Sequence, residues 1–427
     1  MALIQVLEHQ RIAISDRRTE GVEPTMTPHQ AAMLERVEET LPSKALEWGQ
    51  GSVKFAQFCG VIAIGDDTIE ILPKIYGREG GIGESRDLLV QMLFVARRMK
   101  LHPGSSASIR LQKHHLLDVF IRQFCDELFF QLRQGMIRRY VDCEDDLRVL
   151  RGKLNMTRQV RSNAVHRELL SCEYDELLEN NEYNQIIKRV LVRLLAISTA
   201  PSTKRNLTEL SLRFDSVDDR VVSAEEVDDL LLDRTMVRYR TVFEYCRWFL
   251  NGMHPDVVSG GNPYLALLFD MNRLFEEFVA AKLKRAAWTH GLRVRVQGPQ
   301  RYFAMRSGSE VFLMKPDIVL FDESERLVGI VDTKWKVIDE EERKLGVSQS
   351  DLYQMVGYAQ RYGCLKVFLV YPKTEFVTRS HRFDVLPNGP EVHVVPVDLL
   401  ALAGSGASDQ WRDLFAAVAA DRPRAPR

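Results

Sequence analysis

Two apolar runs in the last third of the chain, Ile318–Phe321 and Leu327–Val331, are separated by a short polar segment. A run of this length that is rich in β-branched and aromatic residues predicts a strand, and the polar residues between the two runs predict a turn. The pattern therefore predicts a β-hairpin whose strands are almost entirely apolar.

Counting residues across this hairpin predicts which polar side chains meet at its open end. If Asp322 lies opposite Leu327 across the turn, antiparallel pairing places Asp317 opposite Asp332. Side chains alternate along a strand, so Asp332 and Lys334 share one face of the sheet, and Asp317 lies on that face too. We therefore expect two carboxylates and one ammonium group to converge at the end of the hairpin.

These residue types in this arrangement favour phosphodiester chemistry. Two carboxylates this close repel each other unless a cation lies between them, and Mg²⁺ prefers oxygen ligands. Bound Mg²⁺ neutralises charge on a phosphodiester and lowers the pKa of a bound water, while a lysine orients or deprotonates that water or stabilises the transition state. Pro316-Asp317 and Asp332-Thr333-Lys334 resemble the motif of PD-(D/E)xK phosphodiesterases. The alternative is a charged surface hairpin, because this motif also occurs by chance.

Helical spacing of apolar residues predicts a helix before the hairpin, over residues 267–291, and Gly291 is its stop signal. Glu276 and Glu277 lie within this helix. A helix in this position often supplies a further acidic ligand in PD-(D/E)xK nucleases, so either glutamate is a candidate. A solvent-exposed helix face explains both residues without a catalytic role.

A second helix is predicted after the hairpin, where Asp351, Gln354 and Tyr358 fall at positions i, i+3 and i+7 and therefore share one face. A Gln followed four residues later by a Tyr resembles an accessory pair of RecB-like nucleases, which lines the DNA side of the site. A core tyrosine and an exposed glutamine are the simpler alternative. The apolar run at residues 366–372 predicts another buried strand, which completes the order α-β-β-α-β.

The whole chain is predicted to be α/β, or α+β overall, in three regions and a tail. Residues 1–105 form a β-rich N-terminal domain, in which residues 58–64 and 68–72 flank a turn and predict a hairpin. Residues 106–255 form a helical middle region, residues 256–400 a restriction-endonuclease-like domain of the PD-(D/E)xK type, and residues 401–427 a short helix with a basic tail. Further helices are predicted at residues 88–100, 116–133, 181–197 and 223–233, and a buried aromatic segment at residues 243–250.

Composition limits how such an enzyme holds its substrate. The chain has 427 residues, 45% of them hydrophobic, which is enough for two or three cores. Its formal net charge is −1, so we expect local basic patches or a partner protein to hold DNA. The sequence contains no GxxxxGK[ST] loop, so any nucleoside triphosphate hydrolysis must come from another protein.

Cysteine usage and hydropathy predict the compartment. The six cysteines are scattered without a CxxC pair, so neither a zinc site nor a disulfide framework is expected, and a reducing cytoplasm fits. No apolar run approaches the length needed to span a bilayer, and no secretory signal is visible. We expect a soluble cytoplasmic protein without a membrane partner.

Five short segments, in the same order along the chain, resemble the McrC family, the nuclease subunits of McrBC-type 5-methylcytosine (modification-dependent) restriction systems. Each segment is short, and their common order makes the resemblance specific. It covers most of the chain. The segments are Val61–Gly65 with Ile69–Ile75, Leu150–Leu154, Cys172–Asp175 with Asn181–Asn184, Asn272–Glu276, and the hairpin region with Gln354.

The resemblance implies an activity, a site and a partner. The implied partner is a hexameric McrB-like AAA+ GTPase that reads double-stranded DNA carrying modified cytosine, and the implied docking region is the N-terminal half, above all residues 1–105. The chain itself would stimulate GTP hydrolysis and cut both strands with Mg²⁺. By this likeness the cleavage residues are Glu276, Asp317, Asp332, Lys334 and Gln354, with Tyr358 as an accessory residue and Mg²⁺ held by Glu276, Asp317 and Asp332.

Two other functions compete with this interpretation. One is a non-catalytic adaptor that activates an AAA+ ring while its nuclease fold only grips DNA. The presence of Asp317, Asp332 and Lys334 argues against it, because a degenerate site would have lost at least one of them. The other is a stand-alone RecB-like nuclease, which leaves the first 250 or so residues without a role.

Overall fold

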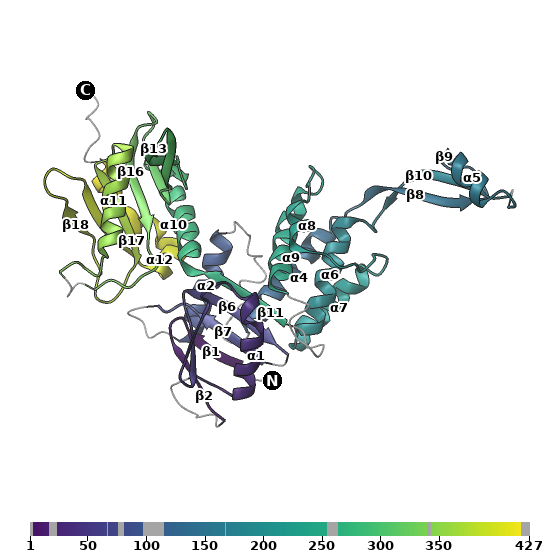
Figure 1. Cartoon of the computed structure of the whole chain (residues 1–427), viewed down its shortest axis with the longest axis horizontal. Helices are drawn as coiled ribbons and strands as arrows, with labels where there is room; N and C mark the ends of the chain where they lie inside the picture. The colour runs from purple at the N-terminus through teal and green to yellow at the C-terminus, as the bar shows by residue number, and fades with distance from the viewer. Residues whose placement is uncertain are drawn as a thin grey trace. The chain divides into compact units, whose positions relative to one another are not determined.

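The computed structural model describes residues 3–16, 24–65, 67–75, 81–96, 115–166, 168–253, 264–339 and 343–419. It is a mixed α/β structure (Figure 1), in agreement with the predicted class. The chain divides into two compact units: the first consists of Val61–Thr68 and His102–Leu267, and the second of Ala2–Gly60, Ile69–Leu101 and Leu268–Arg427. This division differs from the predicted regions 1–105, 106–255, 256–400 and 401–427, because most of the N-terminal region packs with the C-terminal region.

The N-terminal part of the second unit contains a small sheet and one helix. The helix α1 (Pro28–Val37) begins at Thr27, whose side chain and that of Gln30 form a capping box. Residues 76–80 lie outside the described residues. The sheet has the order β3-β2-β5-β4 and consists of β2 (Arg11–Ile14), β3 (Thr25–Met26), β4 (Leu46–Gly49) and β5 (Ser52–Phe55), with β1 (Leu3–Leu7) before it.

The predicted N-terminal hairpin is present as two strands, β6 (Phe58–Ile64) and β7 (Asp67–Leu72). Every residue of β6 is buried, and so is every residue of β7 except the first. These strands therefore belong to a core and do not project into solvent. The helix α2 (Ile82–Ala96) follows, and it begins earlier than the predicted range 88–100, whose last four residues lie outside the described part.

The first unit is largely helical, as predicted. Its helices pack through edge-to-face aromatic pairs such as Phe124 with Tyr245 and Phe249, and Phe243 and Phe249 of the predicted aromatic segment are buried. The predicted acidic helix over residues 223–233 is shorter than expected and ends at Asp228. The helices are α4 (Leu116–Leu132), α6 (Glu182–Ile197), α7 (Pro201–Arg213), α8 (Ala224–Asp228) and α9 (Arg240–Gly252), with a 3₁₀ turn at Val237–Tyr239.

The first unit also contains a long antiparallel hairpin that the sequence patterns did not predict. Its strands are β8 (Arg139–Leu147) and β10 (Leu170–Leu178), and the short strand β9 (Lys153–Leu154) pairs with β10. A small helix, α5 (Met156–Ser162), lies at the far end. Figure 1 shows this hairpin projecting from the helices of its unit. Few of its side chains are buried, so it lacks the apolar alternation that marks a half-buried strand.

The C-terminal part of the second unit is built around a six-stranded sheet with the order β12-β15-β16-β17-β19-β18. β15 and β16 are antiparallel, whereas β16, β17 and β19 run parallel. The predicted order α-β-β-α-β is present as α10-β15-β16-α11-β17, with three unpredicted strands between α10 and β15. The elements are β11 (Tyr264–Asp270), α10 (Met271–Trp288), β12 (Arg293–Val296), β13 (Arg301–Arg306), β14 (Ser309–Met314), β15 (Ile318–Phe321), β16 (Leu327–Thr333), α11 (Gln349–Tyr362), β17 (Lys366–Pro372), β18 (His381–Asp384), β19 (Glu391–Val397), α12 (Leu399–Ala403) and α13 (Arg412–Ala419).

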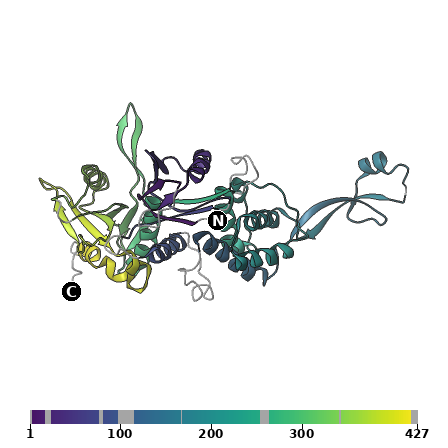
Figure 2. The ribbon, with the colours of Figure 1, turned by 90° about the horizontal axis from the view of Figure 1, so that it is seen from below.

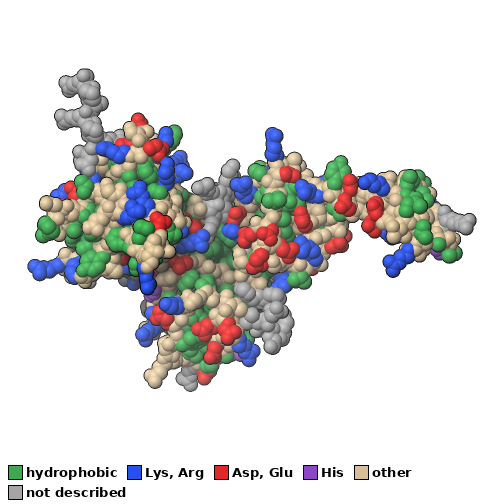
Figure 3. All heavy atoms as spheres, turned by 45° about the horizontal axis from the view of Figure 1, so that its top comes forward, with side chains coloured by type: hydrophobic (Ala, Val, Ile, Leu, Met, Phe, Trp, Pro, Cys, Tyr) green, Lys and Arg blue, Asp and Glu red, His purple; other side chains and the backbone are tan. Residues whose placement is uncertain are grey.

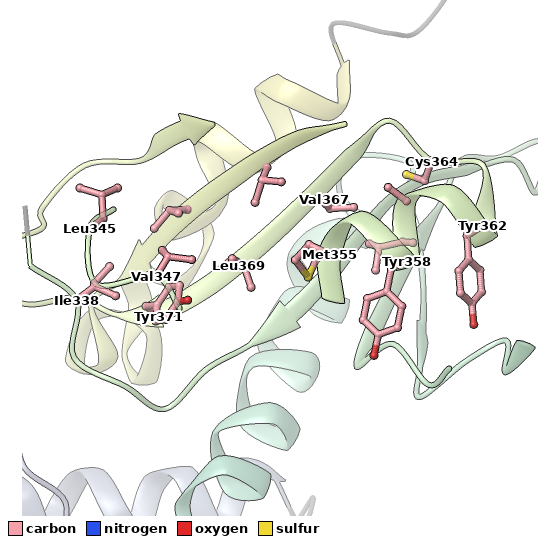
Figure 4. Packing of buried hydrophobic residues seen from close by; sticks show 14 of the residues in the cluster. Ile338, Leu345, Val347, Met355, Tyr358, Tyr362, Cys364, Val367, Leu369 and Tyr371 are labelled. Atoms are coloured by element: carbon pink, nitrogen blue, oxygen red, sulfur yellow. The ribbon is translucent and has the colours of Figure 1, made fainter. Parts of the chain in front are cut away.

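One face of this sheet carries the core that positions α11. Met355 and Tyr358 of α11 pack with Val367 and Leu369 of β17 and with Ile330 of β16 (Figure 4). This packing holds one side of α11 against the sheet, so the polar residues on the neighbouring part of the helix have a fixed position relative to the ends of β15 and β16.

The predicted start of the first helix was wrong by four residues. Residues 267–270 form the end of β11, and α10 begins at Met271. The cause is Asp270, whose side chain accepts hydrogen bonds from the backbone N–H groups of Asn272 and Arg273 and so caps the helix. Gly291 has a φ of 63° and follows the helix end, as predicted.

The register of the central hairpin differs from the prediction at the turn and agrees with it at the open end. Phe321, not Asp322, pairs with Leu327. A bulge next to this pair takes up one residue, so Ile318 pairs with Val331. This register, continued by one residue, places Asp317 beside Asp332.

The C-terminal helix predicted after residue 400 is present as α12 and α13, and the predicted basic tail lies outside the described residues. Among the residues with a described structure, no helix is both long enough and apolar enough to cross a bilayer.

Candidate functional site

The two aspartates of the predicted motif meet at the end of the β15–β16 hairpin. The Oδ2 atom of Asp317 accepts hydrogen bonds from the backbone N–H and the hydroxyl of Thr333, at 2.8 and 2.9 Å. Thr333 lies between Asp332 and Lys334, so these bonds fix the Asp317 carboxylate against the strand that carries the other two motif residues. Burial raises the pKa of Asp317 despite these two hydrogen bonds.

Asp332 is the most deeply buried group of the site, with an exposed fraction of 1%. Burial, reinforced by the negative charge of Asp317, raises the pKa of Asp332 to about 7. Its Oδ2 atom lies 2.7 Å from Lys334 Nζ, and the angle of this ion pair leaves the oxygen without a directed hydrogen bond. A buried carboxylate is costly to ionise unless a cation accompanies it, and the Lys334 ammonium group lies beside this oxygen.

Lys334 is held as a cation by three oxygen atoms. Its Nζ atom lies 2.7 Å from Asp332 Oδ2, 3.6 Å from Asp351 Oδ1, and 3.0 Å from Gln354 Oε1, which accepts its hydrogen bond. Burial acts to lower the pKa of Lys334, but Asp332 and Asp351 outweigh it and the pKa is raised. The side chain is therefore suited to stabilise negative charge and poorly suited to act as a base.

The Gln–Tyr pair on α11 closes the site from one side. The amide nitrogen of Gln354 donates to Asp332 Oδ1 at 3.2 Å and to the Tyr358 hydroxyl at 3.0 Å. The Tyr358 hydroxyl in turn donates to the backbone carbonyl of Lys315 at 3.2 Å, and burial raises the pKa of Tyr358 to about 12. The pair thus links both motif strands, and the alternative of an exposed glutamine does not hold.

Glu276, on α10, lies on the other side of the site. Its Oε1 atom accepts a hydrogen bond from Gln297 Nε2 at 3.1 Å. Burial, reinforced by the negative charge of Asp317, raises the pKa of Glu276. Glu277 instead forms an ion pair with Arg273 at 3.0 Å. The geometry therefore favours Glu276 over Glu277 as the helix carboxylate of this site.

Three contributors to the site had no predicted role. Thr333 holds Asp317, as described above. It occupies the variable position of the motif, so the motif assigns it no role. Asp351, the third member of the predicted helix face, holds Lys334 and lies 3.0 Å from Lys336 Nζ. The hydrogen bond of Gln297 to Glu276 depends on a loop that no sequence pattern indicated.

Trp335 connects the site to the N-terminal segment. Its indole N–H lies 2.9 and 3.1 Å from the two carboxylate oxygens of Glu8, which is buried. Burial raises the pKa of Glu8 to about 7 even though Trp335 and the backbone of Lys74 donate hydrogen bonds to it. The indole ring also packs on Phe275, the residue before Glu276, with ring centroids 5.4 Å apart. Trp335, the residue after Lys334, thus contacts both Glu8, which directly follows β1, and Phe275, the residue before Glu276.

The donor set fits a divalent cation held by two carboxylates. Among the described residues, no three His, Cys, Asp or Glu side chains are close enough to hold one ion together. Mg²⁺ needs no such cage, because it is commonly bound by one or two carboxylates, several waters and substrate phosphates. Asp317 and Asp332 provide hard oxygen ligands, and a cation bound between them would lower their raised pKa values.

The raised pKa of Asp332 predicts how stability depends on pH. A carboxyl group whose folded-state pKa is above its unfolded value binds more protons in the folded state, so its contribution to stability is lost as pH rises from about 4 to about 7. Replacing Asp332 by Asn removes this titration. We expect the melting temperature of Asp332→Asn, relative to the original protein, to be higher at pH 8 than at pH 4, in calorimetry without divalent ions.

Adding Mg²⁺ extends this prediction. We expect Mg²⁺ to raise the melting temperature of the original protein more at pH 8 than at pH 5, because only ionised carboxylates bind it. In the Asp332→Asn variant the Mg²⁺ effect should be much smaller. An equal Mg²⁺ effect in both proteins would contradict a cation site at Asp332.

The chain is similar to one known family and to solved structures. A model of the family described as McrBC 5-methylcytosine restriction system component matches residues 53–372. Among solved structures, the chain resembles one in the refined half-complex from a tetradecameric assembly of Thermococcus gammatolerans McrB AAA+ hexamers with bound McrC, at 20% identity and a TM-score of 0.74, covering 97% of this chain and 99% of that chain. It also resembles a chain in the cryo-EM structure of the Thermococcus gammatolerans McrBC complex, at 23% identity and a TM-score of 0.52, covering 67% of this chain and 88% of that chain. No curated protein sequence matches.

Proposed function

Because this chain belongs to the family of McrBC 5-methylcytosine restriction system components, we propose that it is the nuclease subunit of such a system and cleaves DNA phosphodiester bonds with Mg²⁺. The observation that carries the proposal is the cluster of Asp317, Asp332 and Lys334 at the end of one hairpin. The sheet with α10 and α11 around this cluster supports a restriction-endonuclease-like fold of the PD-(D/E)xK type.

Each residue of the cluster has a role in this proposal. Asp317 and Asp332 would hold Mg²⁺, which when bound neutralises phosphate charge and acidifies a water molecule. Glu276 would bind one of the waters of the ion rather than the ion itself, because no three carboxylates among the described residues are close enough to share one ion. Lys334, kept charged by its neighbours, donates a hydrogen bond to the phosphate oxygen that gains negative charge.

Gln354 and Tyr358 position these groups. Gln354 accepts a hydrogen bond from Lys334 and donates one to Asp332. It therefore holds the ammonium group and the carboxylate in fixed positions at the end of β16. Tyr358 holds Gln354 and, through the Lys315 carbonyl, the entry to β15. Both act through the residues that contact substrate or metal.

The proposed substrate is double-stranded DNA carrying modified cytosine, and the proposed partner is a hexameric McrB-like AAA+ GTPase. The similar solved complexes contain McrB AAA+ hexamers. The sequence of this chain has no phosphate-binding loop of its own. Lys and Arg side chains are interspersed with acidic ones on the face shown in Figure 3, which suits a subunit whose DNA is delivered by a partner.

A reconstituted reaction tests the proposal. The chain is mixed with its AAA+ partner, GTP, and plasmids with or without methylated cytosine. We expect double-strand cleavage of the methylated plasmid that needs Mg²⁺ and GTP. Stimulation of GTP hydrolysis without any cleavage would favour the non-catalytic adaptor, and cleavage that is independent of the partner would favour the stand-alone nuclease.

We place the docking surface for the partner on the projecting hairpin β8–β10 rather than on residues 1–105. Within residues 1–105, the hairpin β6–β7 is buried and therefore does not present its side chains to a partner. The far end of β8–β10 instead exposes several apolar side chains, of which Val165 is 86% exposed. Exposed apolar groups gathered in one place mark an interaction site. The others are Val149, Leu150, Met156 and Val160.

The double variant Met156→Asp/Val160→Asp tests this docking surface. Both side chains lie on the exposed side of α5, one helical turn apart, so the fold should tolerate the change. We expect partner affinity to fall at least about tenfold, because two apolar contacts are lost and two charges must be desolvated. Affinity is measured by titrating the partner, and GTP hydrolysis is followed in parallel.

The matched control is Leu212→Asp, an equally exposed apolar residue on α7. It should leave affinity and stimulation unchanged. Normal affinity of the α5 double variant would move the docking surface to another part of the chain.

A further inference from the structure

The hairpin β13–β14 is an insertion between two strands that both lead to the cleavage site. β12 ends at Val296, and the next residue, Gln297, donates a hydrogen bond to Glu276. β14 ends at Met314, three residues before Asp317. Both ends of the hairpin are therefore anchored at the site. Figure 2 shows the hairpin in green, extending away from the sheet.

The base of the hairpin is held by α11, the helix that carries Gln354. The hydroxyl of Tyr362 lies 2.6 Å from the Pro299 carbonyl and 3.2 Å from the Met314 carbonyl, one at each root. Arg361 donates to the Tyr302 carbonyl at 2.6 Å, and the Arg301 guanidinium lies over the Tyr362 ring, 4.9 Å from its centroid. These contacts fix the direction of the hairpin relative to the site.

Beyond its base the hairpin exposes large apolar side chains. Met305 is 70% exposed and Phe312 is 74% exposed, and Phe303 and Leu313 are exposed as well. Phe312 has a φ of 59°, a left-handed conformation that is unfavourable for a bulky residue. An exposed apolar group on a rigid support is a feature of a binding surface.

We propose that the β13–β14 hairpin lies in the minor groove of the substrate duplex and inserts apolar side chains at a base step, which seats the scissile phosphate on Asp317, Asp332 and Lys334. The proposal rests on the proposed nuclease function, because it assigns the surface that holds the DNA of that reaction.

Charge and continuity favour DNA over a protein as the occupant. The hairpin and the residue that follows it carry Arg301, Arg306 and Lys315 against the single carboxylate of Glu310. Arg306 lies at the exposed tip beside the Ser307-Gly308 turn. Arginine beside a wedge of Phe, Leu or Met is the composition that proteins use to enter and widen the minor groove. The surface is also continuous with the cleavage site, where the duplex has to lie.

The proposed contact distinguishes base sequences only weakly. The minor groove presents a degenerate pattern of donors and acceptors, and apolar wedges recognise how easily a step unstacks. Such a contact leaves the recognition of modified cytosine to the partner and gives this subunit only the placement of the cut.

Binding of a short labelled duplex, without Mg²⁺ so that no cleavage occurs, tests the proposal with the full-length chain. We expect Met305→Ser/Phe312→Ser to weaken binding about tenfold, as loss of base–side-chain stacking does elsewhere. Arg306→Gln should lower the slope of log affinity against log salt by about one. A 2-aminopurine placed in the duplex should brighten when the original protein binds, and not with the double variant.

Trp288→Ser is the matched control, because Trp288 is 78% exposed at the end of α10. It should bind DNA like the original protein, and unchanged circular dichroism should show that all variants fold. The proposal would be overturned if the double variant bound DNA as tightly as the original protein. It would also be overturned if the double variant lost self-association in sedimentation and kept its DNA binding, because the hairpin would then contact a second copy of the chain. If the protein binds through the hairpin and never cuts with its partner, the nuclease function fails and the hairpin assignment stands.

Discussion

Asp332→Asn is expected to reduce DNA cleavage by at least about a thousandfold, because it removes a ligand of an ion that contributes several kcal/mol to the transition state. Asparagine keeps the volume of the side chain and the acceptor for the Gln354 amide, so the local packing is retained. Partner binding and stimulation of GTP hydrolysis should stay within about twofold of the original protein, since metal ligands contribute little to the fold. Plasmid cleavage and GTP hydrolysis are measured in one reaction mixture.

Asp384→Asn is the control for this prediction. Asp384 lies on β18 of the same sheet, and 61% of its side chain is exposed in its ion pair with Arg382. The control variant should cleave normally. Cleavage by Asp332→Asn at a tenth or more of the normal rate would remove this aspartate from the reaction.

Lys334→Met is expected to reduce cleavage about a hundredfold or more. Methionine retains the aliphatic stem and loses the ammonium group that Asp332, Asp351 and Gln354 surround. In other hydrolases, removal of a single preorganised hydrogen-bond donor to the developing negative charge lowers the rate by about two to three powers of ten. The variant should lower kcat more than it changes the KM for DNA, because the ammonium group acts in the transition state.

Stability provides a second readout for Lys334→Met. Without the ammonium group, the two buried carboxylates of Asp332 and Asp351 repel each other when both are ionised, so the variant should melt at a lower temperature than the original protein at pH 8. At pH 5, where Asp332 is protonated, the melting temperature of the variant should return toward that of the original protein. Lys336→Met is the matched control, because Lys336 also pairs with Asp351 but is half exposed. Equal losses of cleavage in both lysine variants would mean that Lys334 acts only by holding Asp351.

The sequence predicted the centre of the site because the relevant elements are buried. β15, β16 and β17 are continuous apolar runs, and α11 shows its helical period, so periodicity alone located four elements. Alternation along β16 then placed Asp332 and Lys334 on the face of Asp317. The bulge in the hairpin altered the turn and preserved the register at the open end.

The parts that sequence patterns did not predict are exposed or depend on distant contacts. The strands of β8–β10 and β13–β14 have few buried side chains, so no apolar period marks them. The role of Thr333 depends on an aspartate sixteen residues earlier, and that of Trp335 on Glu8, at the other end of the chain. Local composition contains no signal for such pairs.

The hydrogen bond between Trp335 and Glu8 joins residues 327 positions apart, and it has a consequence for biosynthesis. During translation, Glu8 is made long before Trp335, and the first unit is completed before β16 is made. The second unit can therefore close only when the C-terminal part has left the ribosome, after a long-range search that slows folding. Under the proposed function, a newly made chain has no assembled cleavage site until β16 and α11 have been made, and a chain terminated before them would not cut the DNA of its own cell.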